Sequence, residues 1–171
     1  MTANVRRLNH AVLYVRDARR SAAFYEEALG FKTVASVGEG AAVFMRAAET
    51  DNHHDLGLFT VGANAPGPER GRTGLYHLAW EVDTIQDLAA MRERLAGLGA
   101  LVGQSDHGVS KSLYAHDPDG IEFEVSWLVP ADRITPEVLA ARTSIGPLDI
   151  ARERQRYGGD TRGGVGVSVP V

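Results

Sequence analysis

The chain has 171 residues, 44% of them hydrophobic and 23% charged, as is ordinary for one globular domain. Its formal net charge of −4 gives no electrostatic case for binding nucleic acid or an anionic membrane. Because the sequence has no cysteine, disulfides, thiolate metal sites and cysteine nucleophiles are excluded. No apolar run approaches the ~20 residues of a membrane span, and the N-terminus lacks the apolar core of a signal peptide. We therefore expect a cytoplasmic enzyme or binding protein.

The first repeat, residues 6–61, has the pattern of a strand, a helix and three further strands. Its opening strand places His10 on one face with Val12 and Tyr14. Asp17 can cap the helix that follows, and Gly30 can end it. The predicted elements are a strand at 9–15, a helix at 18–29, and strands at 32–37, 41–46 and 55–61.

A Gly/Pro-rich connector at 62–74 separates this unit from the next, and the pattern then starts again over residues 74–128. His77 opens the second repeat as His10 opens the first. The predicted elements are a strand at 75–82, a helix at 83–98, and strands at 101–104, 110–116 and 121–127. An internal repeat of this kind predicts two βαβββ units. The expected fold is α+β, with a curved, barrel-like mixed sheet around a metal site and the helices outside.

The sequence changes character after Trp127. Residues 134–141 and 148–157 could form short helices, and the Gly-rich residues 158–171 are expected to fray. We therefore expect one domain at 1–128. A C-terminal extension at 129–171 would follow it, with short helices and then a flexible tail.

Three polar side chains lie on strands that should be half buried. His10 and His77 open the two repeats, so pseudo-twofold packing would bring them together, and Glu124 lies in the last strand. Two imidazoles and one carboxylate suit a divalent first-row metal and leave coordination positions open, as in the non-haem Fe(II) oxygenases. Zn(II) or Mn(II) could use the same groups. Glu122 shares a face with Glu124 and is the alternative ligand; we prefer Glu124 because it lies deeper in the strand.

With these residues in place, the two repeats resemble the vicinal oxygen chelate superfamily, which includes glyoxalase I, bleomycin-resistance proteins and type I extradiol ring-cleaving dioxygenases. The resemblance covers roughly residues 6–127. One stretch of the chain resembles the signature of the extradiol enzymes. It consists of His107, five further residues, Leu113-Tyr114, then Asp117-Pro118-x-Gly120, and finally Glu124. Ser105 departs from this signature, because the family usually has Gly, Asn, Thr, Ile or Val there.

A second resemblance concerns residues 52–58, which look like the paired-histidine strand start of the extradiol enzymes and would place His54 in the active site. Glyoxalase I-like members put a fourth ligand, usually Glu, on the last strand of the first repeat. Residues 55–61 contain no strand-interior Glu, so three protein ligands are expected. The resemblance therefore favours the dioxygenase branch. Metal-free antibiotic-binding members have no need of the triad.

The resemblance implies a metal-dependent dioxygenase that cleaves a catechol-type ring in extradiol fashion with O2. Fe(II) is the expected metal, with Mn(II) or another divalent metal as the alternative, and His10, His77 and Glu124 would hold it. His54 is the candidate general base. His107 would stabilise charge and donate a proton at the oxygen site, and Tyr114 would hydrogen-bond a substrate oxygen.

The expected partners are a small aromatic diol and O2, with no nucleic acid and no membrane, and a homodimer or higher homo-oligomer is expected. Two other functions of the superfamily stay open. One is a glyoxalase-like lyase or isomerase, and the other is a small-molecule-binding resistance protein.

Overall fold

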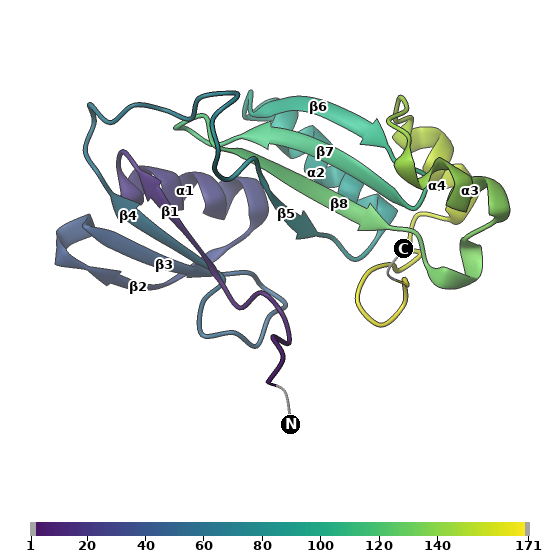
Figure 1. Cartoon of the computed structure of the whole chain (residues 1–171), viewed down its shortest axis with the longest axis horizontal. Coiled ribbons are helices and arrows are strands. Elements are labelled where there is room, and N and C mark those ends of the chain that lie inside the picture. The colour runs from purple at the N-terminus through teal and green to yellow at the C-terminus, as the bar shows by residue number, and fades with distance from the viewer. Residues whose placement is uncertain (1–2, 170–171) are drawn as a thin grey trace. The chain divides into compact units, whose positions relative to one another are not determined.

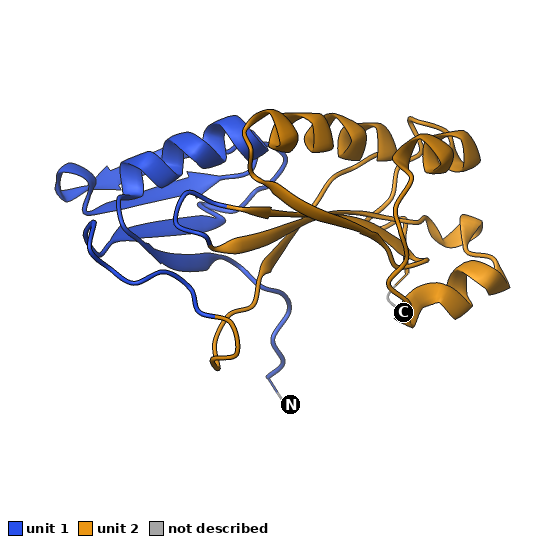
Figure 2. Ribbon diagram, turned by 90° about the horizontal axis from the view of Figure 1, so that it is seen from above, with its two compact units in different colours: residues 1–69, 117–120 blue, residues 70–116, 121–171 orange. Residues whose placement is uncertain are grey.

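The computed structural model describes residues 3–169 and confirms the α+β class, with two βαβββ repeats followed by a helical extension (Figure 1). Its contacts divide the chain into two compact units (Figure 2). Unit 1 comprises residues 1–69 and 117–120, and unit 2 comprises residues 70–116 and 121–171. Each unit holds its own four-stranded sheet, so the strands form two sheets and not the one curved, barrel-like sheet that the sequence predicts.

Unit 1 contains the strand, helix and three strands that the sequence predicts, with ends that differ by a residue or two. The elements are β1 (Ala11–Val15), α1 (Ala18–Leu29), β2 (Lys32–Val37), the 3₁₀ turn η1 (Gly38–Gly40), β3 (Ala42–Arg46) and β4 (Leu56–Thr60). The strand order is β1-β4-β3-β2, and β1 runs parallel to β4. Asp17 caps α1 as predicted, because its carboxylate accepts hydrogen bonds from two backbone N–H groups of the first turn.

One face of the unit 1 sheet packs against α1. Leu13 and Val15 are buried on that face, whereas Val12 and Tyr14 between them are 52% and 75% exposed. The alternation follows from the two-residue period of a strand. Because His10 stands two residues before Val12, the opening histidine lies on the face that α1 leaves open.

Unit 2 repeats the arrangement and adds the C-terminal extension. Its elements are β5 (Leu78–Glu81), α2 (Ile85–Gly97), β6 (Leu101–Asp106), β7 (Ser110–His116), β8 (Glu122–Leu128), η2 (Ala131–Arg133), α3 (Pro136–Ala140), η3 (Ala141–Thr143) and α4 (Ile150–Tyr157). The strand order is β5-β8-β7-β6, and β5 runs parallel to β8. β5 is shorter than predicted, because its pairing with β8 begins only at Leu78. No helix within residues 3–169 is long and apolar enough to cross a membrane.

Side chains along β8 alternate between the buried face and the open face of the unit 2 sheet. Phe123, Val125 and Trp127 are buried, and β8 contacts α2. Glu122 and Glu124 therefore project from the opposite face. Trp127 lies in the core, with 0% of its surface exposed.

The Gly-rich segment after α4 differs from the frayed tail that its composition predicts. Trp127 Nε1 donates a hydrogen bond to the Thr161 carbonyl at 3.2 Å, and Gly163 N donates to the Asp83 carbonyl at 2.8 Å. A Cβ at Gly163 would lie 1.9 Å from the Leu128 carbonyl oxygen, so the two backbones approach more closely than any other residue type would allow. Contacts of this kind hold the segment against the end of β8.

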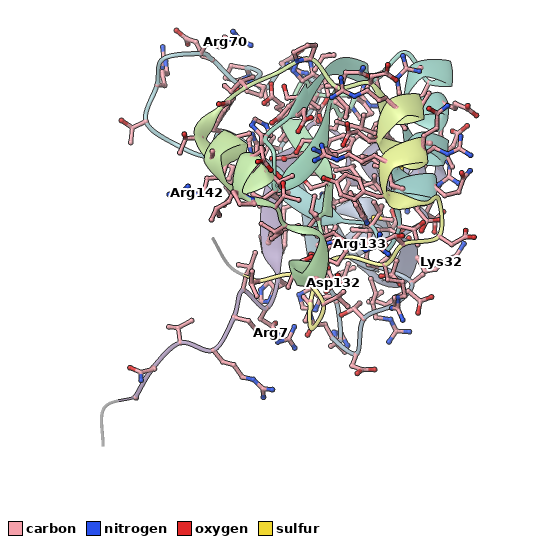
Figure 3. All side chains as sticks on the ribbon, turned by 90° about the vertical axis from the view of Figure 1, so that its right-hand side faces the viewer. Arg7, Lys32, Arg70, Asp132, Arg133 and Arg142 are labelled. Carbon is pink, nitrogen blue, oxygen red and sulfur yellow. The ribbon has the colours of Figure 1, made fainter. Side chains whose placement is uncertain are left out.

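The charged side chains of the extension that Figure 3 labels lie at the surface of unit 2. Asp132 and Arg133 form an exposed ion pair with a 3.7 Å separation. Arg142 Nη1 donates to the Leu139 carbonyl at 3.0 Å, within the extension itself. Such exposed contacts contribute little to stability.

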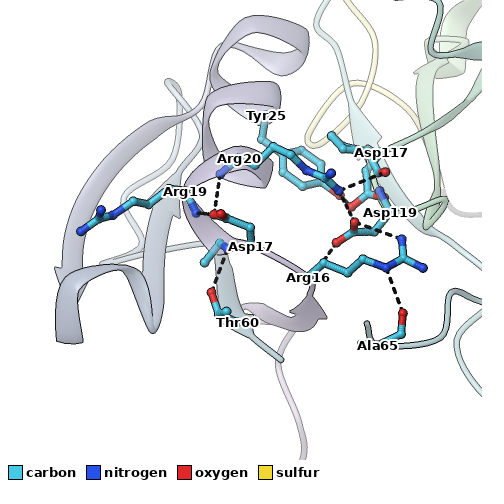
Figure 4. Close-up of polar contacts among 11 residues, drawn as sticks. Arg16, Asp17, Arg19, Arg20, Tyr25, Thr60, Ala65, Asp117 and Asp119 are labelled. Atoms are coloured by element: carbon cyan, nitrogen blue, oxygen red, sulfur yellow. Dashed lines mark hydrogen bonds and ion pairs between the residues drawn. The ribbon is translucent and has the colours of Figure 1, made fainter. Parts of the chain in front are cut away.

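The turn between β7 and β8 groups with unit 1, although both strands belong to unit 2 (Figure 2). Asp119 is nearly buried; its carboxylate accepts hydrogen bonds from the backbone N–H of Arg16 at 2.6 Å and from the guanidinium groups of Arg16 and Arg20 (Figure 4). Tyr25 Oη donates to Asp117 Oδ2 at 3.4 Å. The Asp-Pro-Asp-Gly turn therefore does more than reverse the chain: its two carboxylates bind the first repeat.

Candidate functional site

His77 and Glu124 meet on the open face of the unit 2 sheet. Ala79 pairs with Glu124 in the parallel β5–β8 register, and His77 stands two residues before Ala79 on the same side of the strand. His77 Nε2 lies 3.0 Å from Glu124 Oε2. Ser126 Oγ donates to the other carboxylate oxygen at 2.7 Å, which helps to hold Glu124 in this position.

Glu122 approaches the other nitrogen of the same imidazole. His77 Nδ1 is 3.5 Å from Glu122 Oε1, and His116 Nε2 is 3.6 Å from Glu122 Oε2. The two carboxylates that the sequence places on one face of β8 therefore lie on opposite sides of the His77 ring. Glu124 faces Nε2, and Glu122 lies between the two histidines.

His107 and Tyr114 form a second pair on the same side of the sheet. Tyr114 lies opposite Glu124 in the β7–β8 register, and its hydroxyl is 2.9 Å from His107 Nε2. His107 Nδ1 lies 3.0 Å from the carbonyl oxygen of Ser144, in the C-terminal extension. Burial, and then the negative charge of Glu124, raise the pKa of Tyr114, so this phenol is protonated at neutral pH.

A pocket of about 390 Å³ opens within unit 2 beside these groups. Three predicted site residues line it, His77, His107 and Tyr114, and so does Glu122. A pocket with a few convergent polar groups is the usual form of a small-molecule site. Its volume fits an aromatic ring with a substituent.

Two further predicted residues, His10 and His54, lie together in unit 1. Their ring centroids are 4.5 Å apart, and His54 also contacts Phe44 with centroids 5.1 Å apart. Burial lowers the pKa of His54, and the neighbouring imidazoles of His10 and His53 lower it further. His54 is consequently neutral at pH 7 and able to accept a proton. His53, the neighbouring histidine of the pair, is exposed.

The predicted ligand triad is divided between the two units: His10 in unit 1, and His77 with Glu124 in unit 2. Within residues 3–169, no group of three or more His, Cys, Asp or Glu side chains is arranged to hold a metal ion. The complete triad stays a prediction.

The His77–Glu124 pair does fit two ligands of one metal. Two ligand atoms about 2.1 Å from a metal and at right angles lie about 3.0 Å apart. The distance from His77 Nε2 to Glu124 Oε2 is also 3.0 Å. The donor set of one imidazole and one carboxylate suits a divalent first-row metal.

Two groups contribute to this site that the sequence patterns do not predict. The first is the backbone carbonyl of Ser144, which cannot be recognised from residue type because every residue has one. The second is Ile145, which lines the pocket from the C-terminal extension. The position of Glu122 did have a signal, since its spacing from Glu124 placed both on one face. Only the strand register distinguishes their contacts with His77.

Comparison with known proteins connects this geometry with a family. The family model described as the Glyoxalase/Bleomycin resistance protein/Dioxygenase superfamily matches residues 7–125. Catechol-2,3-dioxygenase from Bacillus subtilis is 32% identical over 119 residues, which cover 69% of this chain and 40% of that enzyme. The chain therefore spans less than half the length of this dioxygenase.

Solved structures share the fold. A glyoxylase/bleomycin resistance protein/dioxygenase domain from Frankia sp. EAN1pec has a TM-score of 0.61 and 26% identity, covering 74% of this chain and 100% of that one. Lactoylglutathione lyase from Agrobacterium tumefaciens has a TM-score of 0.52 and 26% identity, covering 68% of this chain and 90% of that one.

Proposed function

Because this chain belongs to the glyoxalase/bleomycin resistance protein/dioxygenase superfamily, we propose that it is a metal-dependent dioxygenase that cleaves a catechol-type ring beside its two hydroxyl groups with O2. One observation carries the proposal: the His77–Glu124 pair and the His107–Tyr114 pair lie on one side of the unit 2 sheet. The first pair suits a metal, and the second suits proton transfer. The identity to the Bacillus subtilis catechol dioxygenase supports the same chemistry.

The proposed metal is Fe(II), with Mn(II) or another divalent metal as the alternative. His77 and Glu124 would supply two ligands, and His10 is proposed as the third. When bound, Fe(II) would act as a Lewis acid and template for the diol and O2, and would let electrons pass between them. Three protein ligands leave coordination positions for both reactants.

The side chains around the pocket would orient the diol and handle its protons. Since the pKa of Tyr114 is raised, its hydroxyl can serve as a hydrogen-bond donor throughout the neutral range. His107 Nε2, 2.9 Å from that hydroxyl, is the atom at which a proton would be held and released. His54, whose pKa is lowered, is proposed as the base that takes a proton from the substrate.

A glyoxalase-like lyase is the second candidate, because the lactoylglutathione lyase of Agrobacterium tumefaciens shares the fold at 26% identity. Such an enzyme would need no O2. The absence of a carboxylate in β4, whose sequence is Leu-Gly-Leu-Phe-Thr, counts against a fourth ligand from that strand.

The test is to load the purified protein with Fe(II) without oxygen, add catechol or biphenyl-2,3-diol, and then admit O2. We expect oxygen uptake together with a yellow ring-cleavage product, and we expect both to disappear in Glu124→Gln. Asp132→Asn, at an exposed position outside the pocket, is the matched control and should retain both signals. Failure of a broad panel of catechols to consume oxygen would refute the dioxygenase. Turnover of a glyoxalase substrate with Zn(II) or Ni(II), without oxygen, would select the lyase.

A further inference from the structure

We propose that residues 144–146 of the C-terminal extension are a working part of this pocket. Their backbone determines which ring nitrogen of His107 carries the proton and which accepts a hydrogen bond. The Ile145 side chain favours substrates with an apolar body. The segment lies beyond residue 125, where the match to the family ends. The substrate part of the proposal rests on the dioxygenase function proposed above, whereas the positioning part does not.

The segment is attached to the edge of the unit 2 sheet. Asp106 N donates to the Gly146 carbonyl, and Gly146 N donates to the Asp106 carbonyl, both at 2.9 Å. β6 is the last strand in its sheet, so its outer edge would otherwise leave backbone groups unpaired. The two hydrogen bonds hold the segment against Asp106, the residue that precedes His107 in the chain.

A second set of contacts holds the extension against the same loop. A Cβ at Gly108 would lie 2.5 Å from the Val138 carbonyl oxygen, so α3 packs directly on the loop backbone. Lys111, which is 1% exposed, places its Nζ 2.5 Å from Asp106 Oδ1 and 3.3 Å from Glu153 Oε2 in α4. A buried cation between two carboxylates is costly to separate, so it opposes movement of the extension away from the loop.

The consequence for His107 follows from the chemistry of the carbonyl. A carbonyl oxygen can only accept a hydrogen bond, so the 3.0 Å contact with Ser144 O requires a proton on His107 Nδ1. In the neutral imidazole, Nε2 then carries no proton and accepts a hydrogen bond from Tyr114 Oη at 2.9 Å. The extension therefore makes Tyr114 the donor and His107 the acceptor in this pair.

Ile145 is one of three exposed apolar side chains that line the pocket. Its side chain is 81% exposed, and it lines the pocket with Tyr76 and Val102, which are 72% and 52% exposed. The less exposed part of the lining includes His77 and His107, and the exposed Arg70 also lines the pocket. A substrate that matches this distribution has its two oxygens at one end and an apolar substituent at the other. Catechols with an aryl or second fused ring fit this description.

The positioning claim can be tested on the metal-free full chain. Long-range proton–nitrogen spectra of protein labelled with ¹⁵N-histidine distinguish the two neutral tautomers, and His107→Gln assigns the relevant signal. We expect the Nδ1–H tautomer for His107 in the wild-type protein. Observation of the Nε2–H tautomer would overturn the claim, whatever the enzyme activity.

A pair of substitutions at Gly146 then tests the attachment. Gly146→Pro removes the N–H that bonds Asp106, whereas Gly146→Ala keeps it, and an added Cβ meets Asp106 O at an ordinary 3.5 Å. We expect the His107 tautomer to be lost or mixed in Gly146→Pro and retained in Gly146→Ala. Identical spectra for the two variants would contradict the proposal. If Gly146→Pro fails to fold, the wild-type spectrum still decides it.

The substrate claim is tested by the ratio of kcat/KM for biphenyl-2,3-diol to that for catechol. Ile145→Ala should lower this ratio about 10-fold, because the lost apolar contact affects only the substituted diol. Leu139→Ala removes a half-exposed leucine of the same extension that does not line the pocket, and should leave the ratio unchanged. An equal loss for both diols in Ile145→Ala would overturn the claim. If neither diol is turned over by wild-type protein, the dioxygenase function fails instead, and the tautomer measurement stands separately.

Discussion

His77 Nε2 lies 3.0 Å from Glu124 Oε2, while Nδ1 of the same ring faces Glu122 Oε1 at 3.5 Å. The imidazole thus has one carboxylate on each side. In metal sites a histidine ligand commonly donates its second ring N–H to a carboxylate, which fixes the ring orientation. On this basis we propose Glu124 for the ligand position and Glu122 for a supporting position beside the ring.

This assignment predicts unequal effects of two matched substitutions on metal affinity. Glu124→Gln should weaken Mn(II) or Co(II) binding by on the order of 100-fold or more, because it removes a ligand charge. Glu122→Gln should weaken it by on the order of 10-fold, because it removes only the support of the His77 ring. Titration calorimetry of the metal-free protein measures both without any assay of turnover. A larger loss in Glu122→Gln than in Glu124→Gln would reverse the assignment.

The secondary structure follows from patterns that the sequence shows directly. Alternation along residues 122–128 predicts the buried face of β8, and Asp17 and Gly30 predict both ends of α1, because these signals depend on local geometry. The C-terminal tail could not be predicted in the same way. Its contacts depend on the close approach of the Gly163 backbone to Leu128, which is not a local property.

The site shows the same division between local and non-local information. Strand alternation places Glu122 and Glu124 on one face, but it cannot decide between them, because both satisfy the two-residue period. The choice needs the parallel register that sets Ala79 opposite Glu124. The role of Ser144 could not be predicted at all, since every residue carries a backbone carbonyl.

The nearly buried carboxylate of Asp119 predicts a clear loss of stability on its removal. Asp119→Asn should lower the free energy of unfolding by about 1–3 kcal/mol, because the contacts with Arg16 and Arg20 lose their charge. Solvent screens these contacts in part, because the two arginine side chains are 30% and 51% exposed. Urea unfolding followed by circular dichroism measures the change.

Asp132→Asn is the control for this measurement, since Asp132 is 78% exposed and pairs with a half-exposed arginine at 3.7 Å. Its unfolding free energy should stay within about 0.5 kcal/mol of the wild-type value. Equal effects of the two substitutions would mean that the Asp119 contacts contribute no more than a surface ion pair.

Tyr25 predicts a specific dependence of stability on alkaline pH. Burial, and then the charge of Asp117, raise the pKa of Tyr25 above its ordinary value, and the residue is 1% exposed. The folded protein therefore favours the protonated phenol. This contribution to stability is fully present below about pH 10, the ordinary tyrosine pKa, and is lost as the pH rises toward the raised folded-state pKa.

In Tyr25→Phe the unfolding free energy should consequently fall less steeply above pH 10, by up to about 1.4 kcal/mol per pH unit. At pH 7 the variant should be about 1 kcal/mol less stable, because the hydrogen bond to Asp117 is gone. Tyr14→Phe, at a 75% exposed position, is the control and should remain within about 0.5 kcal/mol of wild type at pH 7. Parallel alkaline profiles for wild type and Tyr25→Phe would contradict the argument.

The close approach at Gly163 makes the C-terminal tail testable as a packed element. An alanine Cβ there would lie 1.9 Å from the Leu128 carbonyl oxygen and 2.9 Å from Trp127 Nε1, so the tail must move away from β8. Gly163→Ala should therefore cost about 1–3 kcal/mol of unfolding free energy. It should also shift the tryptophan emission to longer wavelength, because the hydrogen bond from Trp127 Nε1 to Thr161 is disturbed. Gly97→Ala, in α2 with no atom within 4 Å of the added Cβ, should instead stabilise by about 0.5 kcal/mol. If Gly163→Ala matched Gly97→Ala in both stability and emission, the tail would not pack against β8 in solution.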